Sequence, residues 1–84
     1  MPDGRNPIDV EIGRRIRKRR ADLGMSQHDL AKRLGADDQQ VQNYETGEDR
    51  VSAFDLMIIC RALNLGVEEM FSPPLEKQRA QRGH

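Results

Sequence analysis

The sequence predicts an all-α fold with five helices in one domain, and two observations lead to this class. Aromatic residues make up only 4% of the 84 residues, so the aromatic and β-branched alternation typical of strands is missing. Apolar residues instead recur three or four positions apart, between Gly residues and Ser, Asn or Asp residues that can cap helices. A domain of this size buries about 60% of the surface that its unfolded chain exposes, so we expect one compact core.

The first helix is expected between Asn6 and Gly24. Asn6 can accept hydrogen bonds from the first amides, and Pro7 suits the first helical position because no hydrogen bond is lost there. The expected inward face consists of residues three or four apart: Ile8, Ile12, Ile16, Arg20 and Leu23. Arg20 is the one charged residue on this face, so it needs a partner or access to solvent.

The second helix is expected between Ser26 and Gly35. Ser26 with Asp29 three residues later resembles a capping box, although Asp is shorter than the usual Glu. Met25 and Leu30 have the spacing of a hydrophobic staple, which sets the angle at which the chain enters the helix. The expected inward residues are Leu30, Ala31 and Leu34.

Only two residues, Ala36 and Asp37, separate Gly35 from the third helix, which Asp37 can cap. Such a short connection predicts a steep crossing of the second and third helices, as in a helix-turn-helix. Val41 and Tyr44 are expected inward, and Gly47 follows the end of the helix. The remaining positions form an exposed polar face: Asp38, Gln39, Gln40, Gln42 and Asn43.

A fourth helix is expected from a second capping pattern, Ser52 with Asp55, to Asn64. Its expected buried residues are Leu56, Ile59, Cys60 and Leu63. A short fifth helix around residues 67–71 is expected to close the core as a lid through Leu65, Met70 and Phe71. We therefore expect a flexible arm at 1–7, one domain at 8–71 and a polar, disordered tail at 72–84, with at most a helical turn at 75–81.

Charge and composition exclude several classes of protein. The formal net charge is zero, and we interpret the basic run at residues 14–20 as a solvated helix face. The sequence has one cysteine, Cys60, and no apolar run of roughly 18 residues, so we expect no disulfide and no membrane span. His28 and His84 have no nucleophile or metal ligand at useful spacing. We expect a soluble, cytoplasmic protein that is not an enzyme and has no cofactor and no metal.

Three segments carry a resemblance to a known family: IGRRIRKRRADLGMSQHDLAKRLG, QQVQNYETG and RVSAFDLMIICRALNLGVEEMF. They resemble the Cro/repressor type of helix-turn-helix DNA-binding domain, over residues 12–71. The matching positions are Ser26, Gln27, Leu30, Ala31, Gly35, Val41, Glu45 and Gly47. The resemblance implies a five-helix transcriptional regulator whose second and third helices form the helix-turn-helix. It implies binding to double-stranded DNA as a homodimer on a palindromic operator, with the helix that begins at Asp38 in the major groove.

The resemblance also implies roles for particular residues. The positions expected to face bases are Asp38, Gln39, Gln40 and Asn43, and we add Gln42 at the flank. Backbone contacts are implied for Gln27, Thr46 and Arg50, and we add Ser26 at the start of the second helix and the cation Arg17 on the first. Arg20 and Glu45 match a pair that forms an internal salt bridge in some relatives. For Asp38 the alternative role is a favourable charge at a helix N-terminus.

The chemistry of the carboxamides supports base contact independently. Gln carries a donor and an acceptor that match adenine N7 and N6, a pairing that contributes roughly 1–3 kcal/mol against the wrong base. Phe54 and Ile58 lie four apart and off the expected buried face, so they form a dimer contact or fold into the core. Two other functions remain open: an antitoxin-like module that binds a protein partner, or a helix-turn-helix scaffold without DNA binding, for which the acids Asp38, Glu48 and Asp49 argue.

Overall fold

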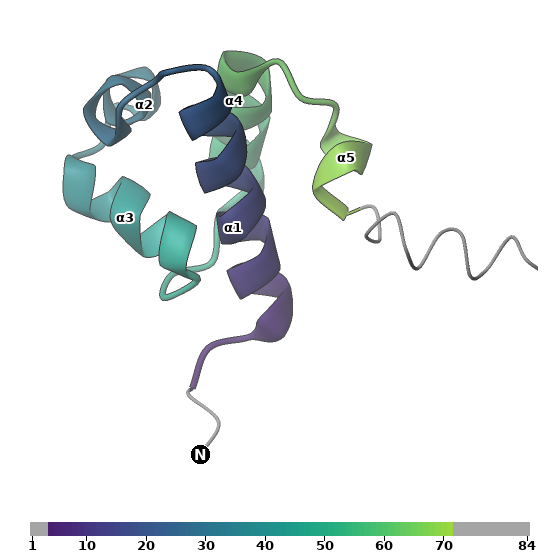
Figure 1. The fold of residues 1–84 in the computed structure, drawn as a ribbon. Helices are drawn as coiled ribbons and strands as arrows, with labels where there is room; N and C mark the ends of the chain where they lie inside the picture. Colours follow the sequence, from purple (N-terminus) through teal and green to yellow (C-terminus); the bar gives the residue numbers. More distant parts are fainter. Residues whose placement is uncertain (1–3, 72–84) are drawn as a thin grey trace, which may run out of the picture.

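The computed structural model describes residues 4–71, and within that range the chain forms five helices and no strand. The helices are α1 (Pro7–Asp22), α2 (Gln27–Leu34), α3 (Asp38–Thr46), α4 (Ala53–Leu63) and α5 (Val67–Phe71). The predicted all-α, five-helix class is therefore confirmed. Figure 1 shows α2 and α3 on one side of α1 and α5 on the other, with α4 behind α1. The expected tail at 72–84 lies outside the described residues, as do residues 1–3.

The first four helices begin at the expected capping residues, which are Asn6, Ser26, Asp37 and Ser52. At α2 the capping box is complete: Ser26 Oγ accepts from the Asp29 amide at 3.0 Å, and Asp29 Oδ2 accepts from the Ser26 amide at 3.2 Å. The shorter Asp side chain is thus long enough. At α4 only the serine half forms, because the carboxylate of Asp55 accepts from Tyr44 instead.

The connection between α2 and α3 begins with a tight C-terminal cap on α2. Gly35 adopts φ 66°, a left-handed conformation that a side chain would disfavour, and the amide of Ala36 donates to the Ala31 carbonyl at 3.0 Å. The chain can then turn within two residues into α3. In Figure 1, α2 is seen nearly end-on while α3 lies across the view, so the two helices cross steeply as predicted.

The core draws on all five helices. Its buried apolar residues are Ile12, Ile16, Leu30, Ala31, Val41, Tyr44, Ile59, Cys60, Leu63 and Met70. The inward positions expected on α2, α3 and α4 are all in this set or packed against it. None of the helices within residues 4–71 is long and apolar enough to cross a membrane.

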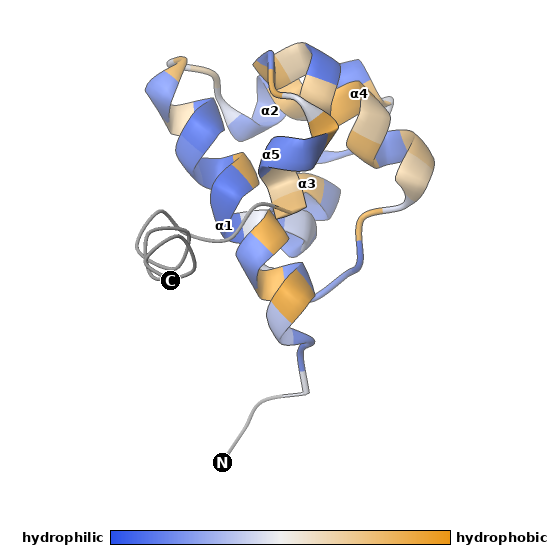
Figure 2. Cartoon of the chain, turned by 90° about the vertical axis from the view of Figure 1, so that its right-hand side faces the viewer, coloured by the Kyte–Doolittle hydropathy of each residue, from blue (hydrophilic) through white to orange (hydrophobic). Residues whose placement is uncertain are grey.

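Three side chains that were expected to be inward are exposed. Ile8 and Leu23, at the two ends of α1, are 63% and 45% exposed. With 16 residues, α1 is roughly 24 Å long and extends beyond the helices packed on it, as its N-terminal turns do in Figure 2. Phe71 is 56% exposed, because the short α5 turns Met70 inward in its place. The expectation that these three residues pack in the core is wrong.

The contact between α1 and α3 depends on a glycine. A Cβ atom added at Gly13 would lie 2.3 Å from the carbonyl oxygen of Tyr44 and 2.6 Å from that of Glu45. Gly13 therefore lets the backbone of α3 lie directly on α1, and any larger residue would push the two helices apart. This contact determines how closely α3 approaches α1.

Candidate nucleic-acid interface

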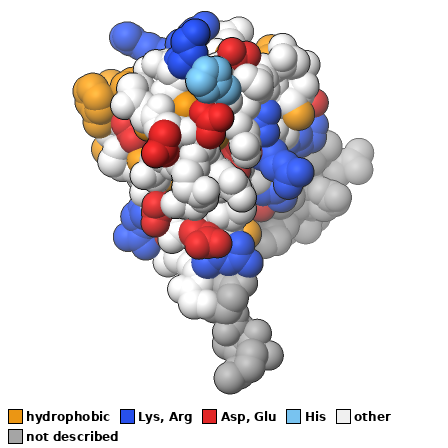
Figure 3. All heavy atoms as spheres, turned by 90° about the vertical axis from the view of Figure 1, so that its left-hand side faces the viewer, with side chains coloured by type: hydrophobic (Ala, Val, Ile, Leu, Met, Phe, Trp, Pro, Cys, Tyr) orange, Lys and Arg blue, Asp and Glu red, His pale blue; other side chains and the backbone are white. Residues whose placement is uncertain are grey.

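The exposed side of α3 is polar, and acidic side chains lie near the middle of the surface around it. Gln39 and Gln42 are exposed, while Gln40 and Asn43 are half-buried. Figure 3 shows uncharged and acidic side chains over the middle of this side of the molecule, with Lys and Arg toward its edges. Any attraction of a polyanion to this surface therefore comes from its rim.

Three of the expected base-contacting carboxamides form one hydrogen-bonded chain with Asp49. Oδ2 of Asp49 accepts from Gln40 Nε2 at 3.1 Å and from Asn43 Nδ2 at 3.2 Å. Oδ1 of Asn43 in turn accepts from Gln39 Nε2 at 3.0 Å. The sequence did not reveal this role of Asp49, since it depends on how the loop after Gly47 returns to α3. The carboxamides are thus held in place by one another and by an acid.

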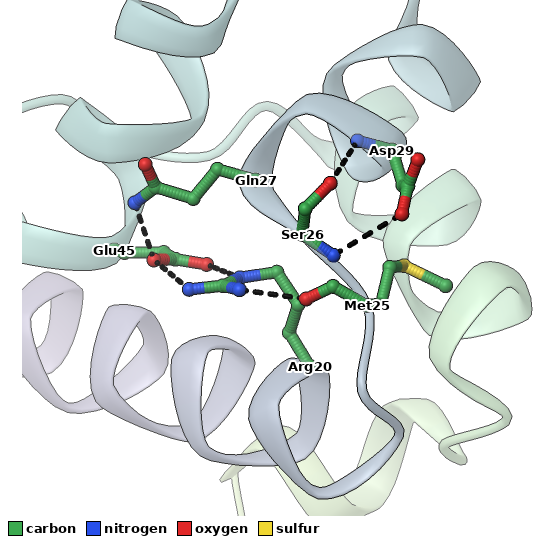
Figure 4. A network of polar contacts seen from close by, with 6 residues as sticks. All are labelled: Arg20, Met25, Ser26, Gln27, Asp29 and Glu45. Atoms are coloured by element: carbon green, nitrogen blue, oxygen red, sulfur yellow. Dashed lines mark hydrogen bonds and ion pairs between the residues drawn. The ribbon is translucent and has the colours of Figure 1, made fainter.

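A second polar network lies behind the N-terminus of α2 and joins three helices (Figure 4). Arg20 on α1 forms two hydrogen bonds with Glu45 on α3, Nε to Oε2 at 2.6 Å and Nη2 to Oε1 at 3.1 Å. Arg20 Nη1 also donates to the carbonyl of Met25 at 2.7 Å, and Gln27 Nε2 donates to Glu45 Oε1 at 3.0 Å. The side chain of Glu45 is only 2% exposed, so this ion pair is shielded from solvent. The expected pairing of Arg20 with Glu45 is present.

An open hollow lies over this network. The residues that line it are Arg17, Arg20, Ser26, Gln27, Gln42, Glu45 and Thr46. It thus brings together four of the five expected backbone-contacting residues, and it also contains Gln42, which was expected among the base contacts. The fifth, Arg50, lies apart and pairs with Asp9 at 3.2 Å. Arg5, in the arm that was expected to be flexible, donates from Nη1 to the Thr46 carbonyl at 2.8 Å, a contact that no sequence pattern indicates.

The basic run on α1 consists mostly of residues engaged in internal contacts. Arg14 and Arg15 both bind Glu11 and hold the pKa of that carboxyl at about 2, well below its ordinary value of 4.5. The remaining contacts join Lys18 to Asp22, Arg19 to the Leu63 carbonyl and Arg20 to Glu45. Within residues 4–71, Arg17 is the one cation of this run without a hydrogen bond or ion pair, and its side chain faces the hollow.

Two more contacts fix α3 at its ends. At its N-terminus, Asp38 Oδ1 lies 2.9 Å from Nδ1 of His28 on α2, and both side chains are exposed. Toward its C-terminus, Tyr44 donates its hydroxyl proton to Asp55 Oδ2 on α4 at 2.6 Å. Burial of the Tyr44 hydroxyl raises its pKa to about 12, and the hydrogen bond to Asp55 adds to the shift. α3 is therefore joined by side-chain contacts to both α2 and α4.

Comparison with known proteins decides the family. A helix-turn-helix family model matches residues 16–70, which is more than half of the chain. The chain belongs to this family, in its Cro/repressor type. An uncharacterized HTH-type transcriptional regulator of Sinorhizobium medicae is 50% identical over 66 residues, 79% of this chain and 48% of that protein. A transcriptional regulator in the ATPase CF(0) region of Rhodospirillum rubrum is 42% identical over 77% of this chain and 60% of its own length.

Solved structures agree with this family assignment. The restriction-modification controller protein C.AhdI from Aeromonas hydrophila has a TM-score of 0.68 at 33% identity, over 73% of this chain and 92% of that one. The P22 c2 repressor, solved in complex with a synthetic operator, has a TM-score of 0.66 at 27% identity, over 70% of this chain and 89% of that one. The relatives are named as regulators, which agrees with the expectation that the chain is not an enzyme. The chain spans about half to three fifths of the length of the curated relatives.

The two residues expected at a dimer contact of this helix-turn-helix domain lie on α4. Phe54 is 72% exposed, so it does not fold into the core, and Ile58 is half-buried. Met57 beside them is also exposed. Within residues 4–71 no group of three or more His, Cys, Asp or Glu side chains is placed to hold a metal ion. Cys60 is buried in the core, and burial raises the pKa of its thiol.

Proposed function

We propose that the chain is a sequence-specific regulator of transcription that binds double-stranded DNA with α3 in the major groove, as a homodimer on a palindromic operator. The observation that carries this proposal is the carboxamide face of α3, Gln39, Gln40 and Asn43, on a helix held by contacts to α1, α2 and α4. A helix without exposed cations gains little from phosphate attraction, so its side chains suit the reading of base edges.

Base contact is assigned to Gln39 first and then to Gln40. The side-chain oxygen of Gln accepts from adenine N6 and its nitrogen donates to N7, a pairing that contributes roughly 1–3 kcal/mol against a wrong base. Asn43 lies one helical turn after Gln39 and reaches a neighbouring base or the backbone. Gln42, which lines the hollow, is placed at the flank of the groove.

Backbone contact is assigned to the hollow at the N-terminus of α2. A phosphate there would meet Arg17, the hydroxyls of Ser26 and Thr46, and Gln27, together with the positive end of the helix dipole. Arg50 is assigned to a second phosphate because its side chain is 72% exposed. To reach that phosphate it must give up its contact with Asp9, whose side chain is only 13% exposed. These contacts fix the register of α3 without reading sequence.

Dimerisation is assigned to the exposed apolar part of α4 around Phe54 and Ile58. A two-fold axis at this surface would present two copies of α3 to one side of a duplex. Half-sites about 34–36 Å apart then follow from the repeat of DNA, and the operator is palindromic because the protein is symmetric. The structural neighbour solved with an operator supports this mode of binding by its fold.

Selection of bound sequences from random duplex DNA at a stated salt concentration tests the proposal. The expected product is a palindrome with adenine at fixed positions in each half, and Gln39→Ala should lose the preference at one of them. Lys18→Ala, a change at an exposed residue on the side of α1 that faces α5, is the control and should select the same palindrome. No enrichment with the unchanged protein would reject sequence-specific binding and favour a module for protein partners or a scaffold without DNA binding.

A further inference from the structure

We propose that Asp49 is a positioning residue that orients the carboxamides of α3 and thereby makes them selective for adenine over guanine. This inference rests on the proposed function, because it concerns how the same surface distinguishes bases. Asp49 belongs to the loop between α3 and α4 and not to the recognition helix itself. Its amide also donates to the Asn43 carbonyl at 3.2 Å, so the loop that carries the carboxylate is attached to α3.

The carboxylate determines which end of each amide faces it. An ionised Asp side chain only accepts hydrogen bonds, so Gln40 and Asn43 must turn their NH₂ groups toward Asp49, at 3.1 and 3.2 Å. Asn43 then turns its oxygen the other way, where it accepts from Gln39 Nε2 at 3.0 Å. The orientation of all three amides thus follows from one acid.

This orientation leaves a defined set of groups for a base. Each glutamine has one N–H engaged in the chain of hydrogen bonds, and each retains a second N–H and a carbonyl oxygen that is unbonded within residues 4–71. One donor and one acceptor are the pair that adenine N7 and N6 require. Guanine presents two acceptors, O6 and N7, and would need both N–H groups of one glutamine. Engaging one of them in the protein therefore disfavours guanine.

Asp49 also opposes binding through its charge. Its side chain is exposed beside the reading face, so it repels the phosphates of any duplex whatever the sequence. Asp49 thus favours selectivity by orienting the carboxamides and opposes affinity by repelling phosphates. Removing it should strengthen binding to all DNA while it weakens the distinction between adenine and guanine, a combination that a purely structural or purely electrostatic role would not produce.

Fluorescence anisotropy with the full chain measures both effects. Affinities are compared for the selected palindrome, for the same palindrome with its read adenines changed to guanine, and for a random duplex, at one stated salt concentration. In Asp49→Ala the ratio of the first two affinities should fall about a hundredfold, because the dimer loses one good bidentate contact of about tenfold in each half-site, while random-duplex affinity rises. Glu48→Ala removes the same charge from the adjacent residue, whose carboxylate makes no contact within residues 4–71, and should raise random-duplex affinity without changing the ratio.

Nuclear magnetic resonance of the free protein provides a second readout that needs no DNA. The side-chain amide signals of Gln39, Gln40 and Asn43 should shift in Asp49→Ala and stay unchanged in Glu48→Ala. Unchanged signals in both variants, an intact ratio in Asp49→Ala, or an equal loss of the ratio in both variants would overturn the inference. If the unchanged protein selects no sequence at all, the proposed function fails instead, and the amide signals still report whether Asp49 orients the carboxamides.

Discussion

Tyr44 is the residue at which α3 and α4 share a hydrogen bond, and its proton reports on that contact. Burial and the bond to Asp55 raise the pKa of Tyr44 from 10.0 to about 12. Because the folded state holds this proton more tightly than the unfolded state, the contact contributes its full stability below pH 10 and loses it as the pH rises to about 12.

We therefore expect the tyrosinate absorbance of the native protein to rise near pH 12, and Asp55→Asn to move the transition toward 10. The sequence has one Tyr and no Trp, so this absorbance belongs to Tyr44 alone. A transition near pH 10 in a protein that circular dichroism shows to be folded would contradict the structural role of the hydroxyl.

The pair of Arg20 and Glu45 carries the largest expected loss of stability for a single change. Glu45 is almost fully buried and receives hydrogen bonds from Arg20 and Gln27, so Arg20→Ala would leave a buried carboxylate without its main partner. We expect the free energy of unfolding in urea to fall by about 3–5 kcal/mol. Arg17→Ala, at an exposed position of the same helix, should change it by less than about 0.5 kcal/mol. A shift of only a few degrees in the melting temperature of Arg20→Ala would show that the ion pair is not needed to hold α3 against α1.

At the scale of elements, the placement of α3 on α1 depends on Gly13. In Gly13→Ala the new Cβ would overlap two backbone carbonyl oxygens of α3, which cannot move as the end of a flexible side chain can. We expect a loss of about 1–3 kcal/mol from this overpacking, measured by thermal unfolding, together with weaker DNA binding because α3 must shift. Gly4→Ala meets nothing within 4 Å and serves as the control. Equal melting temperatures for the two variants would show that α1 and α3 can separate freely.

The elements themselves were predictable because their ends are local. The capping residues Asn6, Ser26, Asp37 and Ser52 act within four residues of sequence, and the structure uses each of them. The exposure of Ile8, Leu23 and Phe71 was not predictable from periodicity, since it depends on how far neighbouring helices extend. The close approach at Gly13 likewise involves residues about thirty positions apart in the sequence.

Some features of the candidate interface were likewise predictable from the sequence and others were not. Residue type and helix face are enough to place Gln39, Gln40 and Asn43 together, and Arg17 and Gln27, both predicted to contact the DNA backbone, line one hollow. The contacts that orient those groups come from outside the helix-turn-helix pattern. Asp49 belongs to the following loop and Arg5 to the N-terminal arm, and no spacing rule links either residue to α3.

At the scale of the whole molecule, charge opposes binding at the centre of the interface and favours it at the rim. The formal net charge is zero, and four cations of the α1 run, Arg14, Arg15, Lys18 and Arg19, lie on the side of α1 that faces α5 and not α3. Few phosphates per subunit can therefore be neutralised, so binding should depend only weakly on salt. In the proposed mode of binding, sequence preference therefore comes from the carboxamides and from the second copy of α3 that a dimer would supply.

The proposed dimer can be tested at Phe54, whose large apolar side chain is 72% exposed in the single chain. A two-fold axis through α4 would bury this residue twice, and each burial contributes roughly 1.5–3 kcal/mol. Phe54→Ser should therefore raise the dimer dissociation constant more than about a hundredfold in analytical ultracentrifugation, since 1.4 kcal/mol is a factor of about ten. Leu23→Ser, at an exposed apolar residue on the far end of α1, should leave the dissociation constant unchanged.

Because a palindrome needs both subunits, Phe54→Ser should also weaken operator binding more than half-site binding. A monomer at high micromolar concentration of the unchanged protein would show that subunits meet only on DNA, and the exposed Phe54 would then need another partner.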